Sequence, residues 1–225
     1  REYFGHSMLK EIYSESLNKY KDVSSYESDL ADANDLITQY FSSYKLPRLA
    51  MHVSGFKENI IVLPDMISLS IDKYLGANYS GYKGFFRDYQ LNEMQSKMIV
   101  RDYLKAWLIS DVRKKNTTEI DLLSAIIEEG KTLYILSVLL PDYNFDDLIG
   151  YTKEQSNWAK DNEKEVWKTI IKQNHLYTTD YLVISKYVEE APLTSTIAGA
   201  NRQLVRLADS KSIYEKDKQS IVGTN

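Results

Sequence analysis

Cysteine is absent from the sequence, and proline and glycine are scarce, at four and nine residues. Without cysteine, disulfides, Cys-ligated zinc, iron–sulfur clusters and thiol nucleophiles are excluded. Long apolar runs are missing too, since the longest candidate, residues 133–140, is far shorter than the roughly 18–20 residues of a membrane-spanning helix. No P-loop, dinucleotide-binding glycine pattern or G-x-S-x-G segment occurs, so nucleotide chemistry and serine hydrolysis have no local motif.

Charges of the two signs are nearly balanced. The 225 residues include 28 Lys and Arg against 32 Asp and Glu, for a formal charge of -4. No cluster of Lys and Arg on one predicted face appears, which argues against nucleic-acid binding, because a phosphate-binding face needs clustered cations. The length and the 43% hydrophobic share suit a globular chain with a sizeable core. We predict a single domain over residues 1–225.

The spacing of apolar residues predicts a mainly helical chain with a small sheet. Residues 2–44 show helical spacing with a break near Ser24 and Ser25, and Pro47 ends this pattern. Three strands are predicted at 49–53, 59–63 and 66–71. Helices are predicted at 91–110, 118–139, 152–173 and 178–190. The fold class is therefore α+β, with a helical region at 1–44, a three-stranded sheet within 45–75, a helical region at 91–195 and a polar tail at 196–225.

Two of these helices have a capping signal at their start. Thr118 stands three residues before Asp121, which is similar to a capping box, and Thr152 with Gln155 matches that motif.

An aromatic loop with several glycines follows the predicted sheet. Its aromatic residues are Tyr79, Tyr82, Phe85 and Phe86. Such a segment either packs as a surface loop or lies over a ligand cleft. Both interpretations stay open, and the packed loop is the simpler one.

Two cations fall on the apolar stripe of the predicted helix 91–110. Arg101 and Lys105 share this stripe with apolar residues at steps of three and four, and Asp102 lies beside them. Glu129 occupies the middle of the apolar stripe of the next helix. Because an unpaired buried ion is costly, we expect Glu129 to face Arg101 or Lys105. The cluster is either a structural ion pair or the remnant of a site, because a sheet followed by two such helices is also the layout of zincin metalloproteases.

Several segments match a known family in their order and spacing. They are NIIV at 59–62, LSIDKYLG at 69–76, LLSAIIEEGK at 122–131, LLPD at 139–142, GYTKEQ at 150–155, NEKEVW at 162–167, LYTTD at 176–180 and EAPLT at 190–194. On these segments, between residues 33 and 195, the chain resembles the gliding-motility lipoprotein GldB family of Bacteroidetes. That family is related to predicted zinc proteases with a zincin-like fold.

The resemblance implies a degenerate metal helix. Where the protease relatives read His-Glu-x-x-His, this chain reads Arg101-Asp102-Tyr103-Leu104-Lys105, and Glu129 matches the glutamate of the second helix. Arginine and lysine cannot ligate zinc as cations, so the resemblance implies a pseudoenzyme with no catalytic residue, metal or cofactor. The tryptophan-bearing helix that closes the family after residue 194 is also replaced, here by a polar tail.

The function implied by the resemblance is binding of an envelope protein or peptide by an outer-membrane lipoprotein that faces the periplasm. Its membrane contact would be a lipid anchor upstream of Arg1. Candidate cleft residues are His52, the aromatic loop residues, Asn162 and Glu163. Two alternatives stay open: an active hydrolase of peptide or cell-wall substrates, and a purely structural helical scaffold. A zinc site made of His52, His175 and Glu129 is the less favoured metal hypothesis, and the remaining histidine, His6, has no ligand spacing.

Overall fold

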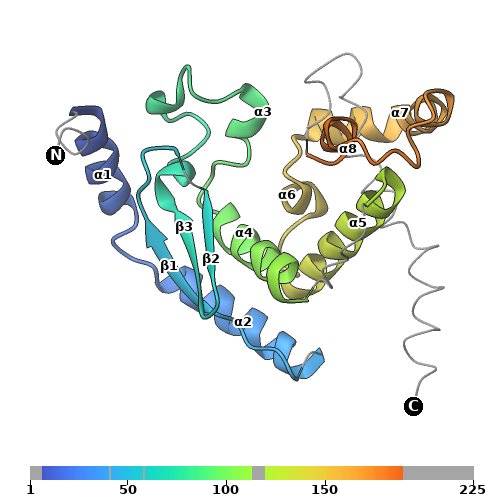
Figure 1. Cartoon of the computed structure of the whole chain (residues 1–225). Coiled ribbons are helices and arrows are strands. Elements are labelled where there is room, and N and C mark those ends of the chain that lie inside the picture. The colour runs from blue at the N-terminus through green and yellow to red at the C-terminus, as the bar shows by residue number, and fades with distance from the viewer. Residues whose placement is uncertain (1–6, 41, 58, 113–119, 190–225) are drawn as a thin grey trace. The chain divides into compact units, whose positions relative to one another are not determined.

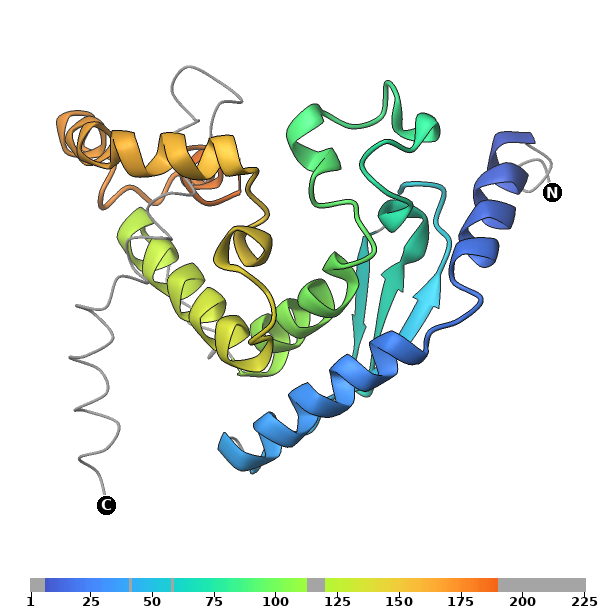
Figure 2. The same cartoon turned by 180° about the vertical axis from the view of Figure 1, so that it is seen from behind.

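The computed structural model describes residues 7–40, 42–57, 59–112 and 120–189. These residues divide into two compact units. The first lies within Arg1–Lys114 and includes Leu139–Asp142, and the second lies within Lys115–Val138 and Tyr143–Asn225. Figure 1 colours the elements along the chain and Figure 2 gives the reverse view.

The first unit begins with two helices, which are followed by a mixed sheet (Figure 1). The helices are α1 (Ser7–Lys19) and α2 (Ser24–Tyr40), and the strands are β1 (Arg48–His52), β2 (Ile60–Leu63) and β3 (Met66–Ser70). The strand order is β1-β3-β2, with β1 parallel and β2 antiparallel to β3. The predicted helical break and all three predicted strands are confirmed. In β3, Ile67 and Leu69 are fully buried, as expected for a central strand.

The segment after β3 is less regular than the sequence predicts. It runs through the 3₁₀ turns η2 (Ile71–Tyr74) and η3 (Ser80–Tyr82) and the short helix α3 (Asp88–Leu91) to α4 (Met98–Trp107), which continues as a π-helical turn, η4 (Leu108–Val112). The predicted helix start at residue 91 is therefore wrong. The backbone N–H of Gly76 donates to the Met94 carbonyl (2.9 Å), so this carbonyl is engaged by another segment and helical pairing begins only after it.

The helices of the first unit cover the sheet and the turn that follows it. Helix α4 packs against β3 and α2, and α1 packs against η2 (Figure 2). A buried cluster of Ile12, Phe56, Tyr82 and Met94 fills the space beneath the aromatic loop. Tyr82 thus anchors the loop in the core, as expected for a packed surface loop.

The second unit consists of helices α5 (Leu122–Leu139, with its last residue in the first unit), α6 (Phe145–Ile149), α7 (Lys153–Lys172) and α8 (Tyr181–Val188). Its core gathers Leu122, Ile126, Val166, Ile170 and Tyr187. Helix α6 has no counterpart in the sequence prediction because its single turn is too short to show apolar periodicity.

Side-chain caps set the starts of all four of these helices, including that of Asn144 at α6. The predicted capping box of Thr152 and Gln155 is confirmed at α7. The other predicted box includes Thr118, which lies outside the described residues, and at α5 the carboxylate of Asp121 accepts the N–H of Ser124 (2.8 Å). Asp180 caps α8 in the same way, as expected for an N-cap aspartate.

The α+β class with its small three-stranded sheet is confirmed. The zincin-like relation and the single domain over 1–225 stay predictions, and the polar tail at 196–225 lies outside the described residues. No helix within the described ranges is long and apolar enough to cross a bilayer.

Candidate functional site

Polar side chains converge where the central strand β3 ends and η2 begins. We call this group the η2 cluster and define it as Tyr74, Glu93, Arg101 and Asp102; Asp72 also lies on η2, two residues before Tyr74. Asp72 is 0% exposed, Arg101 3% and Tyr74 5%. Because three chain segments contribute these side chains, the cluster joins the sheet to α4 and to the turn before α4.

Arg101 is buried on α4 between two carboxylates. Its Nε and Nη2 lie 2.8 and 2.6 Å from Oδ1 of Asp102, and Nη2 lies 3.1 Å from Oε2 of Glu93. Burial works to lower the pKa of Arg101, but the charges of Asp102 and Glu93 outweigh it and raise the pKa above its already high ordinary value. The guanidinium is therefore a permanent buried cation, and its charge is matched inside the first unit.

Tyr74 links this ion cluster to the N-terminal helix. Its hydroxyl donates to Oδ2 of Asp102 (2.8 Å), and its backbone carbonyl accepts from the hydroxyl of Tyr20 (2.5 Å). Burial, followed by the charge of Asp102, raises the pKa of the Tyr74 phenol well above its ordinary value. The phenol is consequently held as a neutral donor.

Asp72 is a buried carboxylate whose role sequence analysis missed, as it missed Tyr74 and Glu93. Its carboxylate accepts the backbone N–H groups of Ser54 (3.1 Å) and Phe56 (2.8 Å) and the hydroxyl of Ser70. These bonds hold Gly55 and Phe56 in left-handed conformations, each with φ 67°. The available signal was a charged residue placed directly after a buried strand, because such a carboxylate must find donors nearby.

Tyr82 joins the predicted aromatic residues to η2, and the rings of Tyr79 and Phe86 pack against it. The Tyr82 hydroxyl donates to the Asp72 carbonyl (2.7 Å) and accepts from the N–H of Leu75 (2.8 Å). The ring of Phe86 stands edge-on to that of Tyr82 at 5.4 Å, and the ring of Tyr79 at 4.9 Å. Phe85, by contrast, is 57% exposed.

His52 lies on β1 beside the central strand. Its Nδ1 is 2.8 Å from the Ser68 hydroxyl, and its buried Nε2 has no hydrogen-bond partner within the described part of the chain. The structure therefore places His52 in the sheet. Among the described residues, no other predicted site residue forms a hydrogen bond with its ring.

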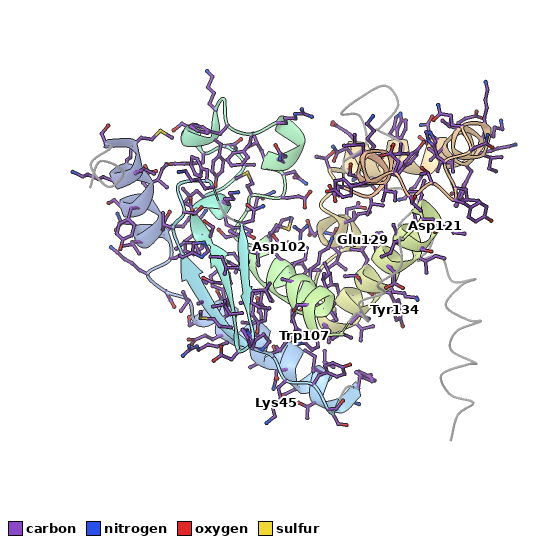
Figure 3. All side chains as sticks on the ribbon, in the orientation of Figure 1. Lys45, Asp102, Trp107, Asp121, Glu129 and Tyr134 are labelled. Atoms are coloured by element: carbon purple, nitrogen blue, oxygen red, sulfur yellow. The ribbon has the colours of Figure 1, made fainter. Side chains whose placement is uncertain are left out.

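The remaining predicted residues fall on other elements. Lys105 is half-buried on α4, and Glu129 is half-buried on α5 in the second unit; Figure 3 labels Asp102 on α4 and Glu129 on α5. The predicted pairing of Glu129 with Arg101 or Lys105 stays a prediction. On α7, the side-chain amide of Asn162 donates to the Trp158 carbonyl (2.8 Å).

The histidine-based metal hypothesis draws on both units. His52 belongs to the first unit, whereas His175 belongs to the second, where its Nδ1 lies 3.0 Å from the hydroxyl of Tyr187. His6 lies outside the described residues. Over the described ranges, no group of three or more His, Asp or Glu side chains is placed to hold a metal ion.

The raised pKa of Tyr74 predicts a loss of stability in alkali. Up to about pH 10 the phenol keeps its proton in both states, so it adds no pH dependence. Above that pH the unfolded phenol ionises while the folded one stays neutral, so the free energy of unfolding falls by ~1.4 kcal/mol per pH unit. We expect Tyr74→Phe to remove this part of the slope in urea unfolding at pH 9, 10 and 11, followed by circular dichroism.

Tyr177→Phe is the matched control for this measurement. Tyr177 is 71% exposed, and its variant should keep the slope of the unmodified chain. Equal slopes for Tyr74→Phe and the unmodified chain would contradict the assignment of Tyr74 as a phenol held neutral by the fold.

Comparison with known proteins gives one match. The family model described as "Gliding motility protein GldB" matches residues 1–203. No curated protein and no solved structure matches the chain.

Proposed function

Because the chain belongs to the gliding motility protein GldB family, we propose that it is a non-catalytic lipoprotein that binds a protein or peptide of the cell envelope. The family match covers most of the chain and places it among gliding-motility-related lipoproteins, which associates it with the cell envelope. A position at the outer membrane, facing the periplasm, is part of the proposal.

The single observation that carries the non-catalytic proposal is the environment of Arg101. In this proposal Arg101 stands at the position of the first metal-ligating histidine of the related zinc proteases. Its guanidinium is 3% exposed and contacts two carboxylates. A guanidinium has five donors and no lone pair for a metal, so it cannot replace an imidazole ligand. In this proposal Lys105 stands at the second histidine and Glu129 helps to neutralise the cations.

The edge of the sheet supports a binding function. Strand β2 lies at one edge of the described sheet, and its Ile61, Val62 and Leu63 are 39%, 46% and 44% exposed. An edge strand that exposes apolar side chains is a suitable template for an added peptide strand, because main-chain hydrogen bonds supply affinity and the side chains select the sequence.

Metal analysis of the purified chain tests this function. We expect zinc well below one equivalent per chain after dialysis, because the positions that would ligate it are cationic. The measurement is elemental analysis by mass spectrometry, on protein dialysed with and without a chelator.

A variant of Asp102 separates the main alternative. Asp102→Asn should leave hydrolysis of peptides or cell-wall fragments at the background level of the unmodified chain. One tightly held zinc per chain would overturn the proposal, and hydrolysis that both a chelator and Asp102→Asn abolish would establish the hydrolase instead.

A further inference from the structure

One exposed aromatic side chain stands on a buried aromatic cluster. Phe85 is 57% exposed, yet its ring centroid lies 5.5 Å from that of Phe56, in an edge-to-face arrangement. Phe56 is 8% exposed and also contacts the rings of Tyr82 (5.3 Å) and Phe86 (5.6 Å). The exposed ring therefore packs on one buried ring, Phe56, which in turn packs against two others, and these contacts orient Phe85 without a partner.

The support beneath Phe85 depends on an unusual backbone conformation. Phe56 has a φ of 67°, and a positive φ is an outlier for a bulky residue. The Asp72 carboxylate holds that conformation by accepting the N–H groups of Ser54 and Phe56. Such local strain concentrates at binding sites and clamps, where the surroundings enforce it. The ring on which Phe85 packs thus belongs to a residue with a strained backbone, Phe56.

Two exposed cations, Lys83 and Arg87, flank the exposed ring of Phe85 in sequence. Lys57, also exposed, follows Phe56, and Nζ of Lys73 lies 5.6 Å from the ring centroid of Phe86. Counting acidic neighbours as well, the segment 83–88 has two cations, Lys83 and Arg87, against one carboxylate, Asp88, so this segment is net positive in a chain with a formal charge of -4.

We propose that the surface made of Phe85 and Phe86 with Lys83 and Arg87, resting on the buried Phe56, is the docking point for an acidic protein segment. A partner side chain of apolar character would pack on Phe85, and carboxylates beside it would contact Lys83 and Arg87. The inference rests on the proposed function, since it names the partner class for a binding protein. One rigid aromatic anchor with a charged rim has the anatomy of a protein interface hot spot.

A membrane surface fits these observations less well. Aromatic rings with nearby cations also suit a bilayer interface, but the tip next to Phe85 is polar. Lys83 and Gly84 are both exposed there, and a Cβ placed on Gly84 would meet no atom within 4 Å. A loop that inserts into lipid would present several apolar residues at this tip, whereas this one presents a single ring.

Selection from a random peptide library on phage, panned on the full chain, tests the proposal. We expect the enriched sequences to carry net negative charge around an apolar residue. Synthetic peptides made from them should lose roughly tenfold or more in affinity for Phe85→Ser, measured by fluorescence anisotropy. Lys83→Glu with Arg87→Glu should weaken binding by a similar factor, and higher salt should weaken binding to the unmodified chain.

Matched controls lie on the second unit. Lys160→Glu with Lys164→Glu reverses two exposed charges of α7 at the same spacing, and Tyr177→Ser removes another exposed aromatic ring; both should bind as the unmodified chain does. Circular dichroism checks that each variant is folded. Enrichment of neutral or basic peptides, or equal affinity for Phe85→Ser, would overturn the proposal. So would flotation with phosphatidylglycerol vesicles that depends on Phe85.

These outcomes are separate from those of the metal analysis. A chain that holds zinc but still binds acidic peptides through Phe85 would refute the non-catalytic assignment and support this surface. A chain free of zinc that selects no Phe85-dependent peptide would refute the surface and leave the non-catalytic assignment standing.

Discussion

Replacing Asp72 by alanine is expected to lower the free energy of unfolding by on the order of 3–5 kcal/mol. The carboxylate is 0% exposed and is the acceptor for two backbone N–H groups and one hydroxyl. Hydrogen bonds to a charged acceptor contribute about 1.5–3 kcal/mol each, and the stranded donors would add a desolvation cost. Urea unfolding followed by circular dichroism measures the loss.

Asp72→Asn distinguishes these hydrogen bonds from simple packing. Asparagine keeps nearly the same volume but offers one acceptor oxygen and a donor amide, so the amide would point at one of the backbone N–H groups of Ser54 and Phe56. We expect Asp72→Asn to be nearly as destabilising as Asp72→Ala. If asparagine restored full stability, Asp72 would act by filling space, and the clamp on Phe56 would be refuted.

Replacing Arg101 by leucine is expected to cost about 3 kcal/mol of unfolding free energy. Removing one partner of a buried ion pair typically costs about 3–5 kcal/mol, because the other charge stays without its counterion. Here the side chains of Asp102 and Glu93 are 17% and 25% exposed, so water can solvate them in part, and the lower end of that range applies. Chemical unfolding at neutral pH is the measurement.

Removing the carboxylates together with the cation provides the control. In Arg101→Leu with Glu93→Gln and Asp102→Asn, no charge is left unpaired in the cluster, so the loss of stability should be clearly smaller than for Arg101→Leu alone. A triple variant as unstable as the single one would mean that Arg101 contributes through packing of its side chain. The conservative variant Arg101→Lys loses the two-nitrogen contact with Asp102, and its stability should lie between those of Arg101→Leu and the triple variant.

Sequence reasoning located the sheet and the buried cation but only part of the cation's environment. The strands were predicted from short apolar runs, from the alternation of apolar and polar residues, and from the breaks at Pro47 and Gly55, all of which are local signals. Helical periodicity placed Arg101 on the buried side of its helix. Glu93, however, lies in an irregular turn before α4, eight residues from Arg101, where no periodic pattern connects the two.

The role of Asp72 depends on a long-range pairing that the sequence does not display. The parallel register of β1 and β3 sets His52 opposite Ser70, and this brings the chain after β1 to the chain after β3. Only then do Ser54 and Phe56 reach the Asp72 carboxylate. No hairpin turn connects parallel neighbours, so local sequence patterns in residues 49–72 predict the strands but not their order in the sheet.

That strand order has a consequence for how the chain matures. Neither β1 nor β2 pairs with the other, since both bond to the last strand made, β3. In the emerging chain, β1 therefore has no partner strand in this sheet until residues 66–70 follow, whereas β2 and β3 are separated by only two residues and can pair as a local hairpin.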